Sequence, residues 1–325
     1  MNPEITDYNA EKKGTGEEGG KGAVDLVSGM KNAGFQASNL ARGAELCEEM
    51  IGDNDCTVFF GFTANLVASG LRGTIAELCR KKKVHAIVTT AGAIDHDVIK
   101  CFMPYEMGIF DVDDAELHKK GINRVGNIFI PNKGFEVFEE NMQKWFAEIY
   151  TGGKKNNKIT SPSAIAKFIG LKIGEEAGKA REGSFLYWCA KNEIPVFCPG
   201  ITDGAIGLQM YFFREENKEF VCDVAADLKP LADMVLNAER TGAIVLGGGI
   251  AKHHIIGANI LREGLDYAVY VTTAQEFDGS LSGAQTREAK SWGKLRERGK
   301  NVTVNCDATI AFPLIAGALR ERGVL

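Results

Sequence analysis

Seven short runs of apolar, β-branched and aromatic residues most strongly constrain how this chain of 325 residues can fold. Each run is continuously apolar instead of alternating, a pattern typical of strands that are covered on both faces, as in a parallel sheet. The runs are "CTVFFGFTA" (56–64), "VHAIVTTAG" (84–92), "NIFIPN" (127–132), "IPVFCPG" (194–200), "AIVLGGG" (243–249), "YAVYVTTA" (267–274) and "VTVNCDATIAF" (302–312).

Helical patterns lie between these runs. In "LRGTIAELCRKKK", Leu71, Ile75 and Leu78 recur at spacings of three and four, and "LADMVLNAERTG" shows the same pattern before Gly242, which we expect to end the helix. "SPSAIAKFIG" offers Ser161 as an N-cap. The alternation predicts an α/β fold, a Rossmann-like doubly wound and mostly parallel sheet with helices on both faces. Functional loops are then expected at the carboxyl ends of the strands.

The domain organisation follows from composition along the chain. The first 25 residues are rich in Gly, Lys and Glu, so we expect a mobile N-terminal arm over residues 1–25. Residues 26–325 are expected to form a single α/β domain, because this length suits one large domain. Within it, "YTGGKKNNKITSPS" (150–163) is the best candidate for a linker between an N-terminal and a C-terminal half.

Overall composition excludes several classes of protein. A net charge of −5 gives no electrostatic footprint for nucleic acid but suits a cationic substrate. No apolar run reaches the ~18 residues that a membrane span needs, and the polar start lacks the apolar stretch of a signal peptide, so we expect a cytoplasmic protein without membrane contact. The eight cysteines form no C-x-x-C pair and are interpreted as reduced and buried.

Several of the predicted strands run directly into Gly, Thr, Asn or Asp. Such loops expose backbone N–H groups that phosphates can approach, although no G-x-G-x-x-G fingerprint occurs, so nucleotide binding and plain structural turns both stay open. His253 and His254 follow the glycines of "LGGGIAKHH" without a third ligand at zinc spacing, so no metal site is expected. By itself this pattern favours a hydrogen-bonded structural histidine over a proton shuttle.

Lys294 stands in "REAKSWGKLRERG" (287–299), a stretch with several other cations. A charge run of this kind is usually a solvated helix face, and this is the interpretation that composition favours. A functional lysine would require the helix to break at Gly293, and Trp292 would then be available to stack on a cationic amine.

Six separated motifs decide between the functional and the purely structural interpretation of these residues. They are "GFTANLVASG", "TTAGAIDHD", "PVFCPGITDGAIG", "GGGIAKHH", "TAQEFDGSLSGA" and "SWGK", the last with Glu288 six positions before Lys294. Together and in this order they resemble the deoxyhypusine synthase family, from about residue 30 to the C-terminus, and the variants present look like its archaeal branch.

The resemblance implies a Rossmann-like fold, NAD as cofactor, and a homotetramer with active sites at a dimer interface. It also implies a reaction in which spermidine is oxidised and its aminobutyl group is captured as an imine by an active-site lysine. That group then passes to one lysine of the precursor of translation initiation factor 5A.

The resemblance also assigns roles to residues. Lys294 matches the lysine that captures the aminobutyl group and His253 the proposed base, while Glu288 and Trp292 match positions that hold the polyamine. The cofactor contacts match Thr63, Asn65, Thr89, Thr90, Asp95, Asp203, Gly248, Gly249, Thr273, Asp278, Ser280, Ser282 and Asp307.

Three substrate-site positions depart from the eukaryotic pattern, which has acidic residues where this chain has His96, Leu208 and Leu281. Leucines remove charge partners that a buried ammonium group would need. Two alternatives on the same scaffold therefore stay open, with agmatine as the donor or with putrescine as the acceptor to make homospermidine. A module that binds NAD without catalysis is disfavoured, because it would have no need of Lys294.

Overall fold

The computed structural model describes residues 22–152 and 159–325, which divide into two compact units. The first unit holds the described residues up to Gly61 together with Met234–Leu325, and the second holds Phe62–Asp233. Most of the predicted N-terminal arm lies outside the described residues. Ala23–Asp25 belong to a helix, so the arm as predicted extends too far. The single domain expected over residues 26–325 stays a prediction.

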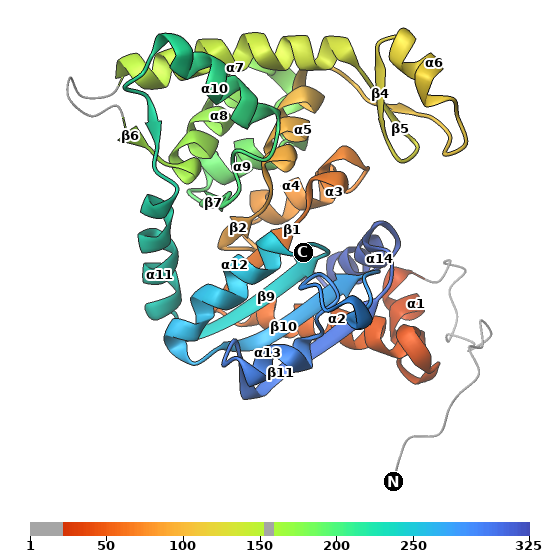
Figure 1. Cartoon of the computed structure of the whole chain (residues 1–325). Coiled ribbons are helices and arrows are strands. Elements are labelled where there is room, and N and C mark those ends of the chain that lie inside the picture. Colours follow the sequence, from red (N-terminus) through yellow and green to blue (C-terminus); the bar gives the residue numbers. More distant parts are fainter. Residues whose placement is uncertain (1–21, 153–158) are drawn as a thin grey trace. The chain divides into compact units, whose positions relative to one another are not determined.

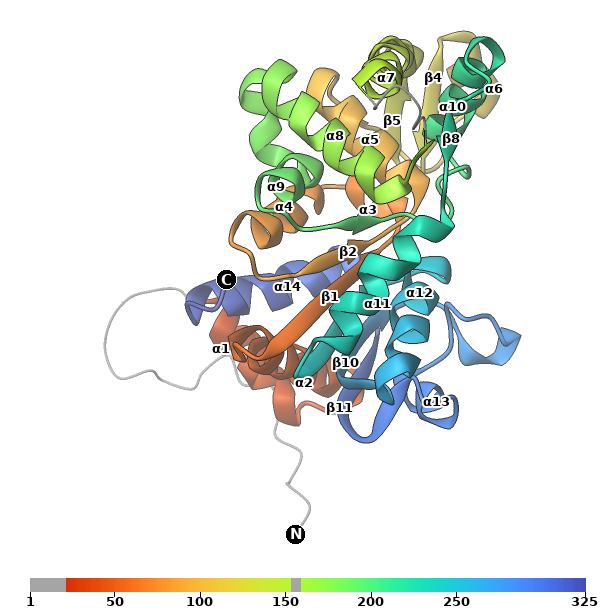
Figure 2. The same ribbon diagram turned by 90° about the vertical axis from the view of Figure 1, so that its left-hand side faces the viewer.

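The first unit is built on parallel strands. Within it the strand order is β11-β10-β9-β1, and β10 pairs in parallel with both β9 and β11. Helices α2 and α14 cover one face, and α12 and α13 cover the other (Figures 1 and 2). The elements are α1 (Ala23–Gly29), η1 (Met30–Asn32), α2 (Phe35–Gly52), β1 (Cys56–Phe62, whose last residue opens the second unit), β9 (Arg240–Leu246), α12 (Ile250–Ala258), η4 (Asn259–Arg262), β10 (Leu265–Thr272), η5 (Glu276–Asp278), α13 (Thr286–Ser291), β11 (Leu295–Asn305) and α14 (Ala308–Glu321).

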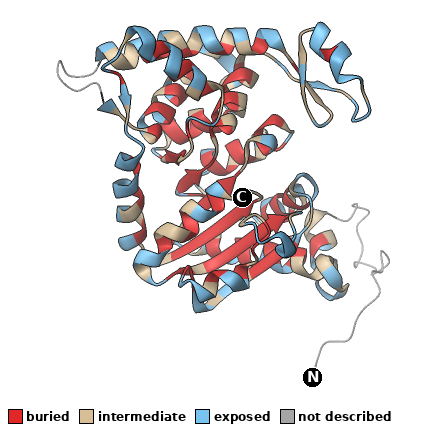
Figure 3. Cartoon of the chain, in the orientation of Figure 1, coloured by how far each residue is buried: buried red, intermediate tan, exposed pale blue. Residues whose placement is uncertain are grey.

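The core of this unit explains why the apolar runs are continuous. Alternate residues of β10 face opposite helices, so both faces of the strand are buried (Figure 3). On one side α2 lies so close that a Cβ at Gly43 would be 3.6 Å from the side chain of Val269. Tyr270, the next residue, contacts Lys252 of α12 on the other side.

The second unit is mostly helical. Its strands β2 and β7 pair in parallel, β3-β5-β4 form a small antiparallel sheet, and β6 and β8 pair in parallel. The elements are α3 (Ala64–Ala68), α4 (Arg72–Arg80), β2 (Ala86–Val88), α5 (Ala91–Phe102), β3 (Glu106–Met107), α6 (Asp114–Lys119), β4 (Ile122–Val125), β5 (Ile128–Pro131), α7 (Asn132–Gly152), β6 (Ile159–Thr160), α8 (Pro162–Glu176), η2 (Gly178–Gly183), α9 (Phe185–Lys191), β7 (Val196–Phe197), α10 (Ala205–Glu216), β8 (Val221–Cys222), η3 (Ala225–Asp227) and α11 (Leu228–Leu236, which continues into the first unit).

The predicted α/β class is confirmed, as are the helix with Leu71, Ile75 and Leu78, now α4, and the N-cap Ser161, whose hydroxyl accepts from the backbone N–H of Ala164. Three details are wrong. The run 127–132 forms the antiparallel strand β5, because it turns back on β4 at once. Gly242 lies inside β9, since α11 already ends at Leu236. The described residues of the predicted linker, 150–152 and 159–163, lie within the second unit, so they do not connect the two units.

All eight cysteines are free, and six of them are buried. Within residues 22–152 and 159–325, no helix has the length and apolar character needed to span a bilayer.

Candidate active site

Lys294 is positioned by the end of a short helix. α13 ends at Ser291, and Gly293 follows Trp292 in the left-handed conformation with φ +66°. The backbone N–H groups of Gly293 and Lys294 donate to the carbonyl oxygens of Lys290 (3.0 Å) and Ala289 (2.9 Å), the two bonds of a Schellman motif. The helix therefore breaks at Gly293, which turns Lys294 inward.

The result is a small cavity of about 30 Å³ in the first unit. Lys294 is only 9% exposed, whereas Trp292 is 65% exposed and its ring centroid lies 5.0 Å from the Lys294 Nζ atom. The predicted substrate residues Glu288 and Leu281 line the same cavity. The solvated-face interpretation that composition favoured is therefore wrong. The lining residues are Lys252, Ile256, Tyr270, Leu281, Ala284, Gln285, Glu288, Ala289, Trp292 and Lys294.

Lys252 and Tyr270 are cavity residues that sequence reasoning missed. Lys252 is almost fully buried, donates to the carbonyl oxygens of Ala284 (2.7 Å) and Ser282 (3.3 Å), and lies 4.8 Å from the centroid of the Tyr270 ring. Burial lowers the pKa of Lys252 to about 8, although the Glu288 carboxylate opposes this shift. The Tyr270 hydroxyl is also buried and has no hydrogen-bond partner among the described residues. The signal in the sequence for Lys252 was a lysine within the helix "IAKHHIIGA", whose other polar side chains are the two histidines.

His253 lies on α12, in the first turns of a helix and not in the glycine-rich loop that precedes it. Burial lowers its pKa below the usual value, and the nearby charge of Lys294 adds to this effect. The imidazole is therefore neutral at physiological pH and can accept a proton close to the Lys294 amine.

The cofactor residues predicted in the first unit follow the carboxyl ends of its strands. Gly248 and Gly249 follow β9, Thr273 follows β10 and Asp307 follows β11. Since these strands are parallel, the three loops lie at one edge of the sheet. Gly248 has φ +81°, which favours glycine, and Asp307 caps α14 through Thr309.

Three more predicted cofactor residues lie between β10 and α13. The Asp278 carboxylate accepts from the backbone N–H of Ser280 at 2.6 Å, and hydrogen bonding from the Ser280 side chain and then from this N–H lowers the pKa of Asp278. The carbonyl oxygen of Ser282 accepts from Lys252, which ties this loop to the cavity. Lys294 differs from all these residues because it precedes β11.

In the second unit, Thr63 and Thr90 are the N-caps of α3 and α5, each with extended backbone. Neither side chain caps its own helix. Thr63 donates to the Asn65 side chain, and the buried Thr90 hydroxyl finds no partner within the described parts of the chain. The Thr89 hydroxyl instead donates to the carbonyl oxygen of Phe62 at 2.8 Å, a structural contact.

Asp95 is 3% exposed, and its carboxylate accepts from the backbone N–H groups of Ala205 (2.7 Å) and Ile206 (3.0 Å) at the start of α10. Burial raises the pKa of Asp95 to about 7, and these two bonds oppose the rise. In this structure its contacts are with backbone, and its role at the cofactor stays a prediction. Asp203 is exposed in the loop before α10.

The other two substituted positions also lie in the second unit. The His96 Nδ1 atom is 2.7 Å from the Tyr105 hydroxyl, and burial and then the charge of Lys100 lower the pKa of His96 to about 4. Leu208 is 53% exposed on α10. Across residues 22–152 and 159–325, no cluster of three or more His, Cys, Asp or Glu side chains could hold a metal ion.

Comparisons with known proteins identify the family of this chain. The deoxyhypusine synthase family profile matches residues 25–319. A probable deoxyhypusine synthase of Methanocaldococcus jannaschii is 47% identical over 289 residues, covering 87% of this chain and 88% of that protein. The deoxyhypusine synthase of Senecio vernalis is 41% identical over 315 residues, covering 89% and 83%.

A crystal structure from Entamoeba histolytica, described as a candidate deoxyhypusine synthase, shares the fold with a TM-score of 0.67. It is 28% identical, and the match covers 90% of this chain and 91% of that one. The chain therefore belongs to the deoxyhypusine synthase family of enzymes.

Proposed function

We propose that this enzyme transfers the aminobutyl group of spermidine, through an imine on Lys294, to one lysine of the precursor of translation initiation factor 5A. The observation that carries the proposal is the cavity in which Lys294 lies buried beside Glu288 and Trp292. A lysine nucleophile needs a desolvated site and a nearby base, and the buried Lys294 and the neutral His253 meet these needs.

The chain's own groups account for the amine chemistry. Glu288 pairs with an ammonium end of the polyamine, and the Trp292 ring stacks on its stem. His253 accepts a proton from the amine, and the Lys294 amine then adds to the oxidised carbon and displaces diaminopropane. The acceptor lysine later displaces Lys294 from the same carbon, so the aminobutyl group moves without net oxidation.

NAD is the proposed cofactor, and it supplies the chemistry of accepting a hydride from the amine and returning it to the final imine. The residues fit a dinucleotide. The Thr90 hydroxyl is buried at the N-terminus of the 12-residue helix α5 without a partner in the described chain. Gly248 allows close backbone approach, and Asp307 is exposed for ribose hydroxyls.

One observation favours retaining a second candidate for the amine donor. Among the described residues lining the cavity, Glu288 is the one carboxylate, while Lys252 and Lys294 supply two cations and Leu281 supplies an apolar wall. This arrangement suits an amine with fewer ammonium groups than spermidine, so agmatine is the second candidate donor. Putrescine as acceptor, giving homospermidine, is the remaining alternative.

Mass spectrometry tests the proposal. The enzyme is incubated with NAD and either spermidine or agmatine, with and without the source organism's factor 5A precursor. We expect factor 5A to gain one aminobutyl group in the spermidine arm and the wild-type enzyme to carry an imine adduct. Lys294→Ala should remove both, whereas Lys290→Ala, a change on the preceding helix α13, should retain both. Unmodified factor 5A together with free homospermidine would contradict the proposal.

We also propose a homotetramer in the cytoplasm. Supporting the assembly, α10 carries an exposed apolar stripe of Leu208, Tyr211 and Phe212, spaced three and four residues apart as on one helix face.

A further inference from the structure

Helix α3 is too short to be stable by itself. It has five residues, and its first turn carries Asn65, next to the N-cap Thr63. A single helical turn is unfavourable without tertiary support, and the last carbonyl groups of a helix lack partners within it. The two expected cofactor contacts therefore lie on an element that something else must hold.

Lys100 of α5 supplies that support. Its ammonium group donates to the carbonyl oxygens of Val67, Ala68 and Ser69 at 3.0, 2.8 and 2.9 Å. Each of its three N–H donors thus has an acceptor at the C-terminal end of α3. A positive charge at this end is also favourable for the helix dipole.

The two helices also meet at their N-terminal ends. A Cβ atom at Gly92, in the first turn of α5, would lie 3.0 Å from the Cβ atom of Ala64 in α3. α5 therefore contacts α3 at both ends, through Gly92 at one end and Lys100 at the other.

We infer that Lys100 is a positioning residue for the cofactor, because it fixes the helix that presents Thr63 and Asn65. The inference rests on the proposed function, since it takes these two residues as cofactor contacts. Lys100 itself lies at the opposite end of α3 and acts through that helix.

The charged and titratable neighbours of Lys100 set the pH at which this support weakens. Burial and then the Arg72 charge lower the pKa of Lys100 to about 8, while the Asp97 charge opposes the shift. His96 and the Tyr105 ring also face the Lys100 ammonium group. A neutral amine has two N–H donors for three carbonyl groups. Support for α3 is therefore complete only well below pH 8 and declines as the pH rises through this value.

Binding calorimetry with NAD, which requires no turnover, tests the inference. We expect Lys100→Met to raise the Kd for NAD roughly tenfold, since it removes hydrogen bonds from a charged donor. The KM for the amine and kcat at saturating NAD should change less than twofold. Lys100→Arg should restore most of the affinity, and Lys167→Met, which removes an exposed lysine from α8, should leave the Kd unchanged.

A pH series separates positioning from general stability. The wild-type Kd for NAD should rise between pH 7 and 9, and the Lys100→Arg variant should show no such rise because arginine keeps its proton. If Lys100→Met does not fold, the pH series on wild type and Lys100→Arg alone decides. An unchanged Kd in folded Lys100→Met, or identical pH profiles, overturns the inference while the proposed function stands. A wild-type protein that binds no NAD overturns both.

Discussion

The chemistry proposed for the cavity depends on one histidine that is neutral when Lys294 needs a base. His253 meets this condition, because burial and the Lys294 charge both lower its pKa. The Lys294 charge acts on His253, and His254 points in a different direction because adjacent residues of a helix do not share a face.

We predict that His253→Ala still binds NAD but turns over about 10²-fold to 10⁴-fold more slowly, the usual contribution of a general base. The measurements are the Kd for NAD and single-turnover formation of the Lys294 adduct. His254→Ala is the matched control and should retain near wild-type rates. Equal rates for wild type and His253→Ala would remove this histidine from the mechanism.

Single residues also show where sequence reasoning ends. The break at Gly293 could be predicted, because only a left-handed turn lets Lys294 leave the face of its helix. The burial of Lys252 and of Asp95 could not be predicted. Their burial depends on partners distant in sequence, the carbonyl oxygen of Ala284 and the backbone of Ala205, and no local pattern indicates such a pairing.

At the scale of elements, the positions of strands were predicted better than their ends. The predicted strand run 302–312 extends too far, because β11 ends at Asn305 and α14 begins at Ala308. The loops after β9, β10 and β11 lie where parallel strands require them. Lys294 lies outside this rule, since it enters the cavity from the turn before β11, and only the motif "SWGK" pointed to it. Gly242 failed as a helix stop because glycine suits a tightly packed strand equally well. Its Cβ position would lie 3.0 Å from the Met50 sulfur.

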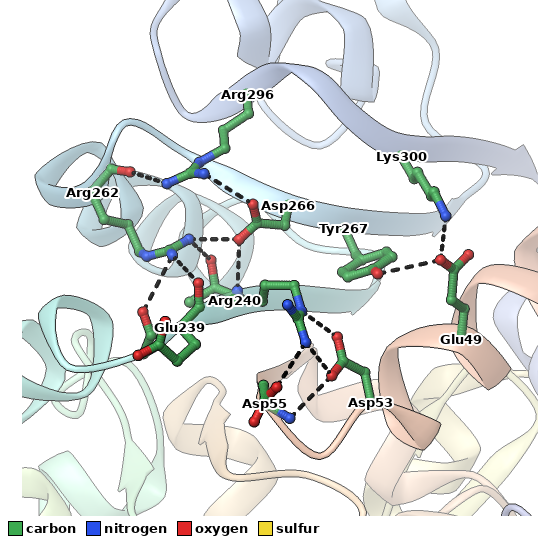
Figure 4. A network of polar contacts seen from close by, with 12 residues as sticks. Glu49, Asp53, Asp55, Glu239, Arg240, Arg262, Asp266, Tyr267, Arg296 and Lys300 are labelled. Carbon is green, nitrogen blue, oxygen red and sulfur yellow. Dashed lines mark hydrogen bonds and ion pairs between the residues drawn. The ribbon is translucent and has the colours of Figure 1, made fainter.

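Ion pairs connect the loops at the amino ends of the strands in the first unit (Figure 4). Arg240, at the start of β9, pairs with Asp53, just after α2, and with Asp55 at 3.1 Å. Hydrogen bonding to Arg240 lowers the pKa of Asp53 below its ordinary 3.8. Since the folded-state pKa is the lower one, the pair stabilises the fold above about pH 4, and this contribution disappears as the pH falls through the folded-state value.

We predict that Asp53→Asn lowers the urea midpoint at pH 7 modestly, because the pair is partly solvated, and that the difference from wild type shrinks towards zero by pH 2. Asp233→Asn, which removes the exposed partner of Lys229 on α11, is the control and should change the midpoint less at both pH values. A deficit of equal size at both pH values would mean that Asp53 acts through packing or through the hydrogen bond that its carboxylate accepts from the backbone N–H of Asp55, not through its charge.

At the scale of the whole molecule, the sequence predicted the class of fold but not its division. The units separate at 61/62 and 233/234, within β1 and within α11. Both positions lie inside regular elements, so no run of Gly, Pro or Ser marks them. The conspicuous polar segment at 150–163 drew attention instead, although the flanking helices α7 and α8 belong to the same unit.

The α10 stripe is where assembly can be tested. Leu208, Tyr211 and Phe212 are 53%, 56% and 47% exposed, and exposed apolar side chains grouped on one helix face mark interaction sites in soluble proteins. Leu208 is also one of the positions at which the eukaryotic pattern of the family has an acidic residue.

We predict that Tyr211→Lys reduces the molar mass measured by light scattering after size-exclusion chromatography, because a lysine charge would have to be buried in the interface. Aminobutyl transfer should fall with it, while the circular dichroism spectrum of the folded chain is retained. Leu236→Lys introduces the same charge at a similarly exposed leucine of α11 and should leave both the mass and the activity unchanged. A Tyr211→Lys protein with wild-type mass would exclude the stripe as the contact between copies, and a dissociated but fully active protein would separate assembly from catalysis.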